Sequence, residues 1–299
     1  GVCAVRPGLD ATVSTSGTGG GETTAGGSSG SGIGSPDGGG SSSTGTTTGS
    51  GGYTTDWSVG GAAVREIYEI DGAYAFGATP ADASVREGIA ELTSRGLAVV
   101  FYPFLMMDVP ADNGLPNPWS AGGATLGQPV YPWRGRITCH PAPGEAGTVD
   151  GTAAAATQVA AFFTEYRAMI LHYAALCAEA GGVDTFLLGS ELVGLTTVRD
   201  DTGAFPAVAA LRSLAAEVRA ILGPATKIGY GADWSEYHSL RPSDGSGDVL
   251  FPLDDLWADE NIDFVGIDNY FPLTDWRDGE DHLDRAPFRS ITDRDYLDA

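Results

Sequence analysis

Carboxylates, an amide and aromatic rings follow the apolar runs of this sequence at the points where those runs end. The side chains concerned are Tyr102, Asp108, Ser190, Glu191, Asp233, Trp234, Glu236, Asp268, Asn269 and Tyr270. Pairs of carboxylic acids cleave glycosidic bonds, and the flat faces of aromatic rings stack on the apolar face of a sugar ring. This combination of residue types therefore points to sugar chemistry.

Glu191 is the strongest catalytic candidate, because it follows an apolar run at 185–189 with only Ser190 between them. A general acid must stay protonated near neutral pH, which requires raising the pKa of a Glu from about 4.3 toward ~6 through burial or a neighbouring negative charge. The apolar run would supply that burial. The alternative is a glutamate that caps or bridges a strand end.

The residues near the other strand ends could have either a functional or a structural role. Asp233 and Glu236 could orient Glu191 or bind sugar hydroxyls, or they could form a loop salt bridge. Asp268 and Tyr270 could line a binding rim or simply pack against neighbours.

A basic and aromatic cluster lies between two of the predicted elements. Trp133 with Arg134 and Arg136 could form a sugar platform that also donates hydrogen bonds to hydroxyls. The alternative is a loop clamp in which the arginines pair with acids of the rim.

Composition excludes several other classes of protein. The formal net charge is −23, with a sequence pI near 4.2, so nucleic-acid binding is not expected. No apolar run approaches the ~20 residues of a membrane helix, so membrane insertion is not expected either. The 4 histidines and 3 cysteines lack metal-ligand or redox spacing. We therefore predict no metal and no cofactor.

The elements that must position these residues alternate between helix and strand. Apolar residues at helical spacing predict helices from Thr79 to Gly96 and at 153–180, 205–222 and 253–258. Short apolar runs predict buried strands at 97–104, 185–189, 227–230 and 262–267. The alternation predicts an α/β fold with a parallel sheet. Periodicity alone does not separate an open doubly wound sheet from a closed (β/α)8 barrel, and the chemistry at the strand ends favours the barrel.

The chain divides by composition into two parts. Residues 1–52 contain a segment at 14–52 that is almost entirely Gly, Ser and Thr, which predicts a flexible insertion. Residues 53–299 have the composition of a globular domain. The chain starts without methionine and both ends look cut, so we expect a partial barrel from a longer polypeptide.

Several blocks in the globular part resemble the glycoside-hydrolase TIM-barrel-like domain of gene transfer agent and phage tail proteins. They are DASV at 82–85, FYPFLMMD at 101–108, YPWRGRIT at 131–138, LGSEL at 188–192, GADWSEY at 231–237 and DFVGIDNYFPL at 263–273. The resemblance implies a (β/α)8 barrel, incomplete at both ends in this chain, within a baseplate or tail-hub (host-specificity) protein. Its partners would be other tail proteins and a cell-surface polysaccharide.

The resemblance also implies roles for individual residues. In similar retaining glycosidases the acid/base is the Glu after the fourth strand, which matches Glu191. Their nucleophile is a Glu after the seventh strand, and no residue of this chain matches it. The residue before the acid/base is often Asn in such enzymes, whereas this chain has Ser190.

Two functions follow as hypotheses, and a third is disfavoured. The first is a retaining glycoside hydrolase in the tail of a virion-like particle, made in the bacterial cytoplasm and acting on the surface glycan of the recipient cell. The second is an inactive glycan-binding or structural baseplate module, which the serine at 190 favours. A nucleotide-binding doubly wound domain is disfavoured because no Gly-rich fingerprint follows a predicted strand.

Overall fold

The computed structural model describes residues 4–9, 58–59, 62–63, 68–70, 73–75, 80–109, 112–120, 127–130, 132–270, 274–277, 279 and 281–298. For the strands β1 (Ala4–Leu9), β2 (Ser58–Val59), β3 (Ala62–Ala63), β4 (Tyr68–Ile70) and β5 (Ala73–Ala75) only the backbone is described. The segment predicted to be flexible, 14–52, lies outside the described residues.

A parallel sheet forms the centre of the molecule. Its strands are β6 (Val100–Phe101), β8 (Thr185–Ser190), β9 (Lys227–Asp233) and β10 (Phe264–Asp268), and their order across the sheet is β10-β9-β8-β6. Every pair of neighbours in this sheet is parallel. The prediction of an α/β fold with a parallel sheet is thus confirmed.

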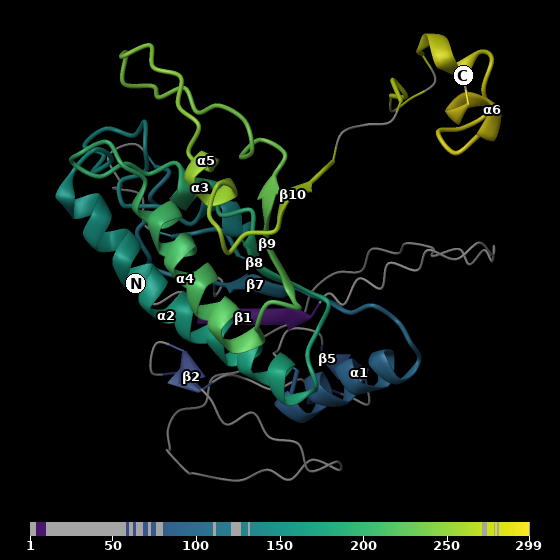
Figure 1. Cartoon of the computed structure of the whole chain (residues 1–299). Helices are drawn as coiled ribbons and strands as arrows, with labels where there is room; N and C mark the ends of the chain where they lie inside the picture. The colour runs from purple at the N-terminus through teal and green to yellow at the C-terminus, as the bar shows by residue number, and fades with distance from the viewer. Residues whose placement is uncertain are drawn as a thin grey trace.

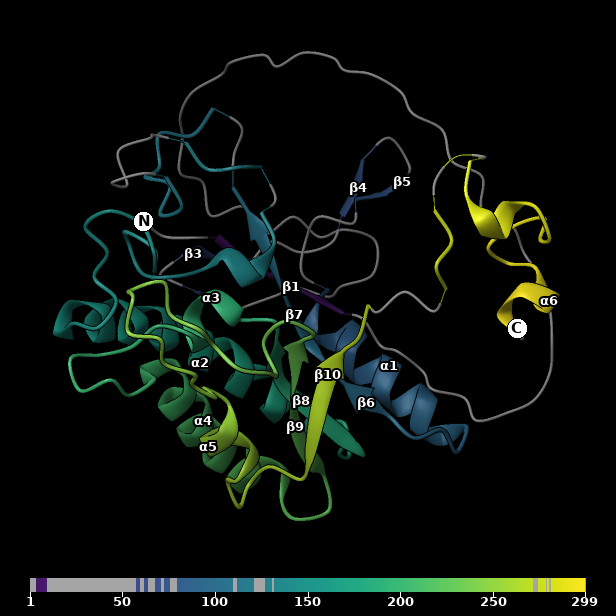
Figure 2. The same ribbon diagram turned by 90° about the horizontal axis from the view of Figure 1, so that it is seen from above.

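Helices alternate with these strands along the chain. They are α1 (Asp82–Ser94), α2 (Ala153–Glu179), α3 (Val193–Thr196), α4 (Pro206–Leu222) and α5 (Asp254–Trp257). Figures 1 and 2 show α2 and α4 side by side along β8 and β9. The order of the four strands follows the chain without a reversal, whereas a doubly wound sheet reverses at its switch point.

The two long helices form because their apolar residues recur at intervals that share one face. In α2 the buried positions include Val159, Phe163, Tyr166, Ile170 and Tyr173, and these pack in one core with the helix-facing residues of the sheet. In α4, proline stands at the first helical position and Gly223 follows the last with φ 75°. The burial of these faces fixes where the strand ends lie.

The strand predicted at 97–104 is divided in two by Tyr102. β6 ends at Phe101, and β7 (Pro103–Asp108) pairs with β1 in antiparallel register, from Ala4 opposite Asp108 to Leu9 opposite Pro103. A periodicity argument cannot foresee this partner, because β1 lies far away in the sequence.

β8 contains an irregularity just before Glu191. Its register against β9 shifts between Leu187 and Ser190, so that an extra residue is accommodated in β8. Gly189 lies there with φ +148°, and a Cβ at this position would be 1.8 Å from the Tyr166 hydroxyl oxygen. The Tyr166 hydroxyl donates to the Leu188 carbonyl at 2.9 Å. Glycine is therefore required, and the shift changes the direction in which the chain leaves the strand.

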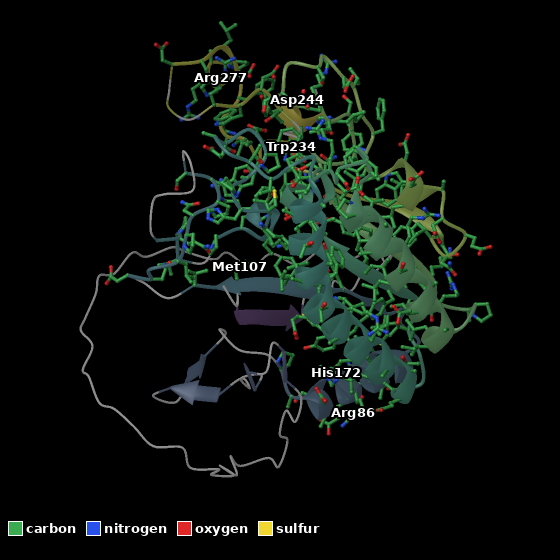
Figure 3. All side chains as sticks on the ribbon, turned by 90° about the vertical axis from the view of Figure 1, so that its left-hand side faces the viewer. Arg86, Met107, His172, Trp234, Asp244 and Arg277 are labelled. Atoms are coloured by element: carbon green, nitrogen blue, oxygen red, sulfur yellow. The ribbon has the colours of Figure 1, made fainter. Side chains whose placement is uncertain are left out.

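The two ends of the molecule carry different side chains. Figure 3 shows Trp234 and Asp244 at one end and Arg86 and His172 at the other. The first end is where β8 and β9 finish, so it is the end where parallel sheets place their chemistry. Among the described helices, none combines the length and apolar character that crossing a membrane requires.

Candidate functional site

Glu191 lies directly after β8 in an unusual backbone conformation. Its φ is +53°, in the left-handed region that residues other than glycine rarely adopt, and its exposed fraction is 4%. Its amide donates to the Gly231 carbonyl of β9 at 2.8 Å. Outliers of this kind cluster at functional sites, where the surrounding structure holds them.

Two neighbouring residues bind the Glu191 carboxylate. They are Trp133, the N-cap of the short 3-10 helix η2 (Arg134–Arg136), and Arg134, the first residue of that helix. The Trp133 indole Nε1 donates to Glu191 Oε2 at 2.6 Å, and Arg134 Nη2 lies 2.9 Å from the same oxygen. A Cβ at Gly135 would be 2.5 Å from the Trp133 ring, so glycine lets the indole fold over η2. The predicted platform thus contacts Glu191 directly.

Arg134 also binds Ser190, the residue before Glu191. Its Nε donates to the Ser190 carbonyl at 3.1 Å and to the Ser190 hydroxyl at 3.0 Å. Its guanidinium lies 3.7 Å from the centre of the Phe104 ring, in a cation–π contact. Arg134 is 7% exposed, so this cation is buried between β7 and β8.

Tyr102 and Asp268 meet beside Ser190. The Tyr102 hydroxyl donates to Asp268 Oδ2 at 3.0 Å. A Cβ at Gly231 would be 3.0 Å from the Tyr102 hydroxyl, 3.2 Å from Asp268 Oδ1 and 3.3 Å from Ser190 Cβ. The absence of a side chain at 231 lets Tyr102, which follows β6, converge with Ser190 of β8 and Asp268 of β10. Burial raises the pKa of Tyr102, so its hydroxyl stays a donor.

Opposing influences act on the Glu191 carboxyl. Burial raises its pKa, the Trp133 hydrogen bond and the Arg134 charge lower it, and the charges of Asp268 and Asp233 raise it again. The resulting pKa is raised above the ordinary value for Glu. A carboxyl with this property can hold a proton closer to neutral pH than a free one.

Glu236 is a second carboxyl with a raised pKa, but it lies beneath the surface. It is 3% exposed, and burial raises its pKa to about 7. Its oxygens accept from the Thr196 hydroxyl at 2.7 Å, the Tyr230 hydroxyl at 2.9 Å and the Asp233 amide at 3.0 Å. Of the roles that the sequence left open for Glu236, this burial and these hydrogen bonds favour orienting the neighbourhood of Glu191 over binding sugar hydroxyls.

The remaining predicted residues follow β9 and β10 at the same end of the parallel sheet as Glu191. Asp233 is 5% exposed and accepts from the Ser235 amide and hydroxyl. Trp234 is 44% exposed and Tyr270 is 71% exposed, and Asn269 is exposed beside it. The negative charge of Glu191 is the largest cause that raises the pKa of Tyr270. Exposed aromatic rings therefore lie at the same end of the sheet as the buried Glu191.

Arg136 contacts a different partner from the one predicted for it. Its guanidinium lies over the Trp119 ring at 5.0 Å from the centre, and the Trp119 indole donates to the Arg136 carbonyl at 2.7 Å. Arg136, Trp119 and Trp133 line a cavity of about 90 Å³ next to the site, together with Met107, Asn117, Pro118, Gln128, Pro129, Pro132, Ile137 and Thr138. The side chain of Asp108 lies outside the described residues.

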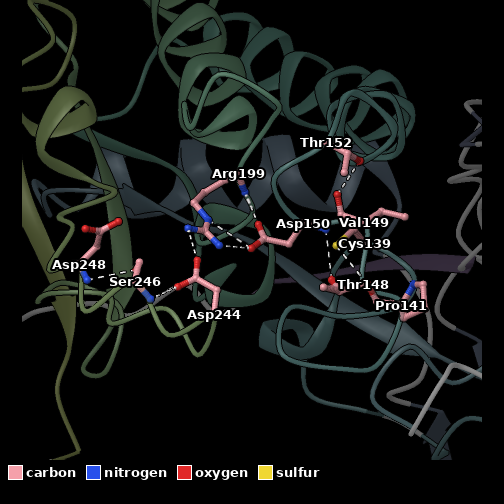
Figure 4. A network of polar contacts seen from close by, with 10 residues as sticks. All are labelled: Cys139, Pro141, Thr148, Val149, Asp150, Thr152, Arg199, Asp244, Ser246 and Asp248. Atoms are coloured by element: carbon pink, nitrogen blue, oxygen red, sulfur yellow. Dashed lines mark hydrogen bonds and ion pairs between the residues drawn. The ribbon is translucent and has the colours of Figure 1, made fainter.

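Sequence reasoning missed two features. Tyr230, 0% exposed in β9, links Glu236 to the backbone after Glu191, and the signal was available because a tyrosine within a buried strand needs a partner for its hydroxyl. The second is Arg199, which bonds Asp150 through its amide at 2.7 Å and its Nη2 at 2.6 Å, and Asp244 through Nη1 at 2.8 Å (Figure 4). These residues line a polar cleft of about 780 Å³.

In the part of the chain that the structure describes, no group of three or more His, Cys, Asp and Glu side chains is placed to hold a metal ion.

Comparison with known proteins gives one family match. No curated protein matches this chain. Residues 164–299 match the family model of the GTA TIM-barrel-like domain, where GTA stands for gene transfer agent, a phage-like particle. The match includes β8, β9 and β10, and with them Glu191, Asp233 and Asp268. This portion of the chain is therefore similar to the TIM-barrel-like domain of gene transfer agent proteins.

Proposed function

We propose that this chain carries the acid/base residue and part of the sugar-binding rim of a retaining glycoside hydrolase that acts on a bacterial cell-surface glycan. The observation that carries the proposal is the environment of Glu191, a buried carboxyl with a raised pKa, at the end of a parallel strand and among exposed aromatic rings. The same features support a (β/α)8 barrel, as do the unreversed strand order and the family match.

The residues present fit the steps of such a reaction. As the nucleophilic carboxylate forms a bond to the anomeric carbon, protonated Glu191 would donate its proton to the glycosidic oxygen and the bond to the leaving sugar would break. Trp133 and Arg134 then stabilise the carboxylate that remains, since both bind Glu191 Oε2. In the second step this carboxylate would take a proton from a water molecule, whose oxygen bonds to the anomeric carbon while the bond to the nucleophile breaks. The resemblance implies that the nucleophile is a Glu after a seventh strand.

The aromatic rings define where the sugar would bind. Trp133, Trp234 and Tyr270 have exposed fractions of 43%, 44% and 71%, unusually high for large rings beside a buried acid. Ordered aromatic faces bury apolar area at small entropic cost, which suits the C–H face of a pyranose. Asp233, Asp268 and Asn269 would bind hydroxyls at the same rim.

The particle context follows from the match to a gene-transfer-agent domain. The chain would belong to the baseplate or tail hub, contact other tail proteins, and meet the glycan when the particle reaches a recipient cell. Cleavage there would open a path to the envelope.

A second function, a glycan-binding baseplate module without turnover, is favoured by one contact. Glu191 and Arg134 form a buried ion pair at 2.9 Å, and an ion-paired carboxylate is a poor proton donor. Serine at 190 is also shorter than the asparagine usual in similar enzymes. Both proposals place the glycan at the same rim and differ only in the chemistry.

The test compares the full-length parent protein with its Glu191→Gln variant on a panel of bacterial surface glycans and β-mannans, because no residue of this chain matches the nucleophile that the resemblance implies. Release of reducing ends measures turnover, and isothermal titration with the same glycans measures binding. Gln keeps the shape of Glu but removes the acid, so we expect activity to fall roughly 10²–10⁴-fold. Glu260→Gln is the matched control, because Glu260 is exposed and precedes the start of β10, whereas the site lies where the strands end.

Each outcome decides between the proposals. A loss confined to Glu191→Gln supports the hydrolase. Glycan binding by both proteins without release of sugar from any substrate supports the binding module. Neither binding nor release from any glycan would overturn both functions.

A further inference from the structure

The backbone at Glu191 is anchored to β9 on both sides of the residue. Its own amide donates to the Gly231 carbonyl at 2.8 Å, and the next amide, of Leu192, donates to the Tyr230 hydroxyl at 2.7 Å. Tyr230 and Gly231 are neighbours in β9. The left-handed conformation of Glu191 is thereby held by two hydrogen bonds that reach the same strand.

The second of these bonds depends on a group further inside. The Tyr230 hydroxyl accepts from Leu192, so its own proton must be donated elsewhere, and Glu236 Oε1 receives it at 2.9 Å. The Thr196 hydroxyl donates to the same oxygen at 2.7 Å, and the Asp233 amide donates to Oε2 at 3.0 Å. Glu236 therefore acts as an acceptor for three donors and fixes the direction of the tyrosine hydroxyl.

None of these groups can meet a substrate. Tyr230, Leu192 and Thr196 are 0% exposed and Glu236 is 3% exposed. Among the described residues, the hydrogen bonds of Glu236 reach the backbone next to Glu191 through Tyr230 and Leu192. A carboxyl of this kind can act on Glu191 through geometry and not through proton transfer to a ligand.

We propose that Glu236 and Tyr230 are positioning residues that hold Glu191 in its left-handed conformation, so that its carboxyl stays on Trp133 and Arg134 at the rim. The geometric part concerns the protein alone, and its consequence for turnover rests on the proposed function. Removal of the Tyr230 hydroxyl frees the Leu192 amide and lets Glu191 relax away from Trp133.

The first experiment needs no glycan. The Trp133 indole N–H donates to Glu191, so its ¹H–¹⁵N resonance in the full chain reports the position of that carboxylate. The chain has 6 tryptophans, and Trp133→Phe identifies the resonance by its loss. We expect Tyr230→Phe to move it toward the shift of a free indole and Glu236→Gln to move it less, because Gln retains one acceptor oxygen.

Tyr173→Phe is the matched control. Tyr173 is also buried, at 1% exposed, but it lies in α2 against Phe101. It should leave the Trp133 resonance unchanged. An unchanged resonance in Tyr230→Phe, in a protein that still unfolds cooperatively, overturns the proposal. Should Glu236→Gln not fold, Tyr230→Phe carries the test, since it removes one oxygen and keeps the ring.

The second experiment measures turnover where the wild type has it. Misplacement of a reacting group by about 1 Å can cost about 10²-fold in rate. We expect Tyr230→Phe to lower kcat about 10–100-fold with KM within about twofold, because the aromatic rim is untouched. Loss of KM with kcat preserved would overturn the positioning role. A wild type that neither binds nor cleaves glycan removes the proposed function, while the Trp133 resonance still decides the geometry.

Discussion

Arg134 and Arg199 each form ion pairs with carboxylates. The two clusters differ in how deeply the carboxylates are buried and in how many negative charges surround the arginine. Arg134 is buried with Glu191, at side-chain exposures of 7% and 5%, and the charges of Asp233 and Asp268 also act on that glutamate. Arg199 bonds Asp150 and Asp244, and the side chain of Asp244 is 39% exposed. The first cluster has more buried acids than its cation can neutralise, and the second has an exposed acid that water helps to solvate.

The pKa values follow this difference. At the first cluster burial outweighs Trp133 and Arg134, so the pKa of Glu191 is raised. At the second, the Ser246 amide, the Ser246 hydroxyl and Arg199 lower the pKa of Asp244 to about 2. The contrast separates a carboxyl that can carry a proton in a reaction from carboxylates that tie loops together. We therefore expect the Arg199 network to stabilise the fold without taking part in chemistry.

The largest effect is expected from Arg134→Met at pH 7. This substitution leaves the buried Glu191 without its cation, and breaking a buried pair from one side costs about 3–5 kcal/mol. Urea unfolding measures the free energy. The double variant Arg134→Met with Glu191→Gln should recover part of the loss, because the unpaired charge is gone. A loss below about 1 kcal/mol would mean that the pair is effectively solvated.

A smaller effect is expected from Arg199→Met. Hydrogen bonds to charged groups contribute about 1.5–3 kcal/mol, and this change removes such bonds from three loop segments. Any glycan turnover should stay within about twofold of wild type. Arg95→Met is the control, since the exposed helical pair Arg95–Glu91 should contribute less than about 1 kcal/mol. Loss of turnover without loss of stability would instead assign the polar cleft to substrate binding.

The next effect depends on pH. Burial raises the pKa of Glu236 from 4.5 to about 7, so the folded protein binds this proton more tightly than the unfolded chain. The stability from this group is complete below about pH 4.5 and is lost as the pH rises to about 7. The slope is at most about 1.4 kcal/mol per pH unit for one proton. The Glu236→Gln variant should lack this dependence of stability on pH. Urea unfolding of both proteins at several pH values measures it. Parallel curves for both proteins would contradict the raised pKa.

The smallest effect is expected at Asp244, and it has the opposite sign. The pKa of this carboxyl is lowered from 3.8 to about 2, so its contribution is present above about pH 3.8 and is lost as the pH falls to about 2. Asp244→Asn should therefore lose less stability than wild type on acidification. Thermal midpoints between pH 2 and 5 measure the difference, with the loop neighbour Asp248→Asn as control. An acid slope that is unchanged in Asp244→Asn would show that the Ser246 and Arg199 contacts do not persist in solution.

The sequence by itself determined the order of the elements and the position of the key acid. The helices expected at 153–180 and 205–222 and the strands at 185–189 and 227–230 are confirmed within a few residues. Helical and strand periodicities are local properties, because they depend on which residues face one shared core. Glu191 at the end of its strand was predictable for the same reason.

Only the tertiary structure decided which side chains meet and how deeply they are buried. Trp133 and Glu191 are 58 positions apart, and Tyr102 and Asp268 are 166 apart, so no local pattern pairs them. Arg134 contacts Glu191 whereas Arg136 stacks on Trp119, although both carry the same charge. The register shift just before Glu191 and the buried hydrogen bond between Glu236 and Tyr230 likewise appear only in the assembled sheet. Partner choice and burial depend on contacts between distant segments, and these contacts exist only once the strands have assembled.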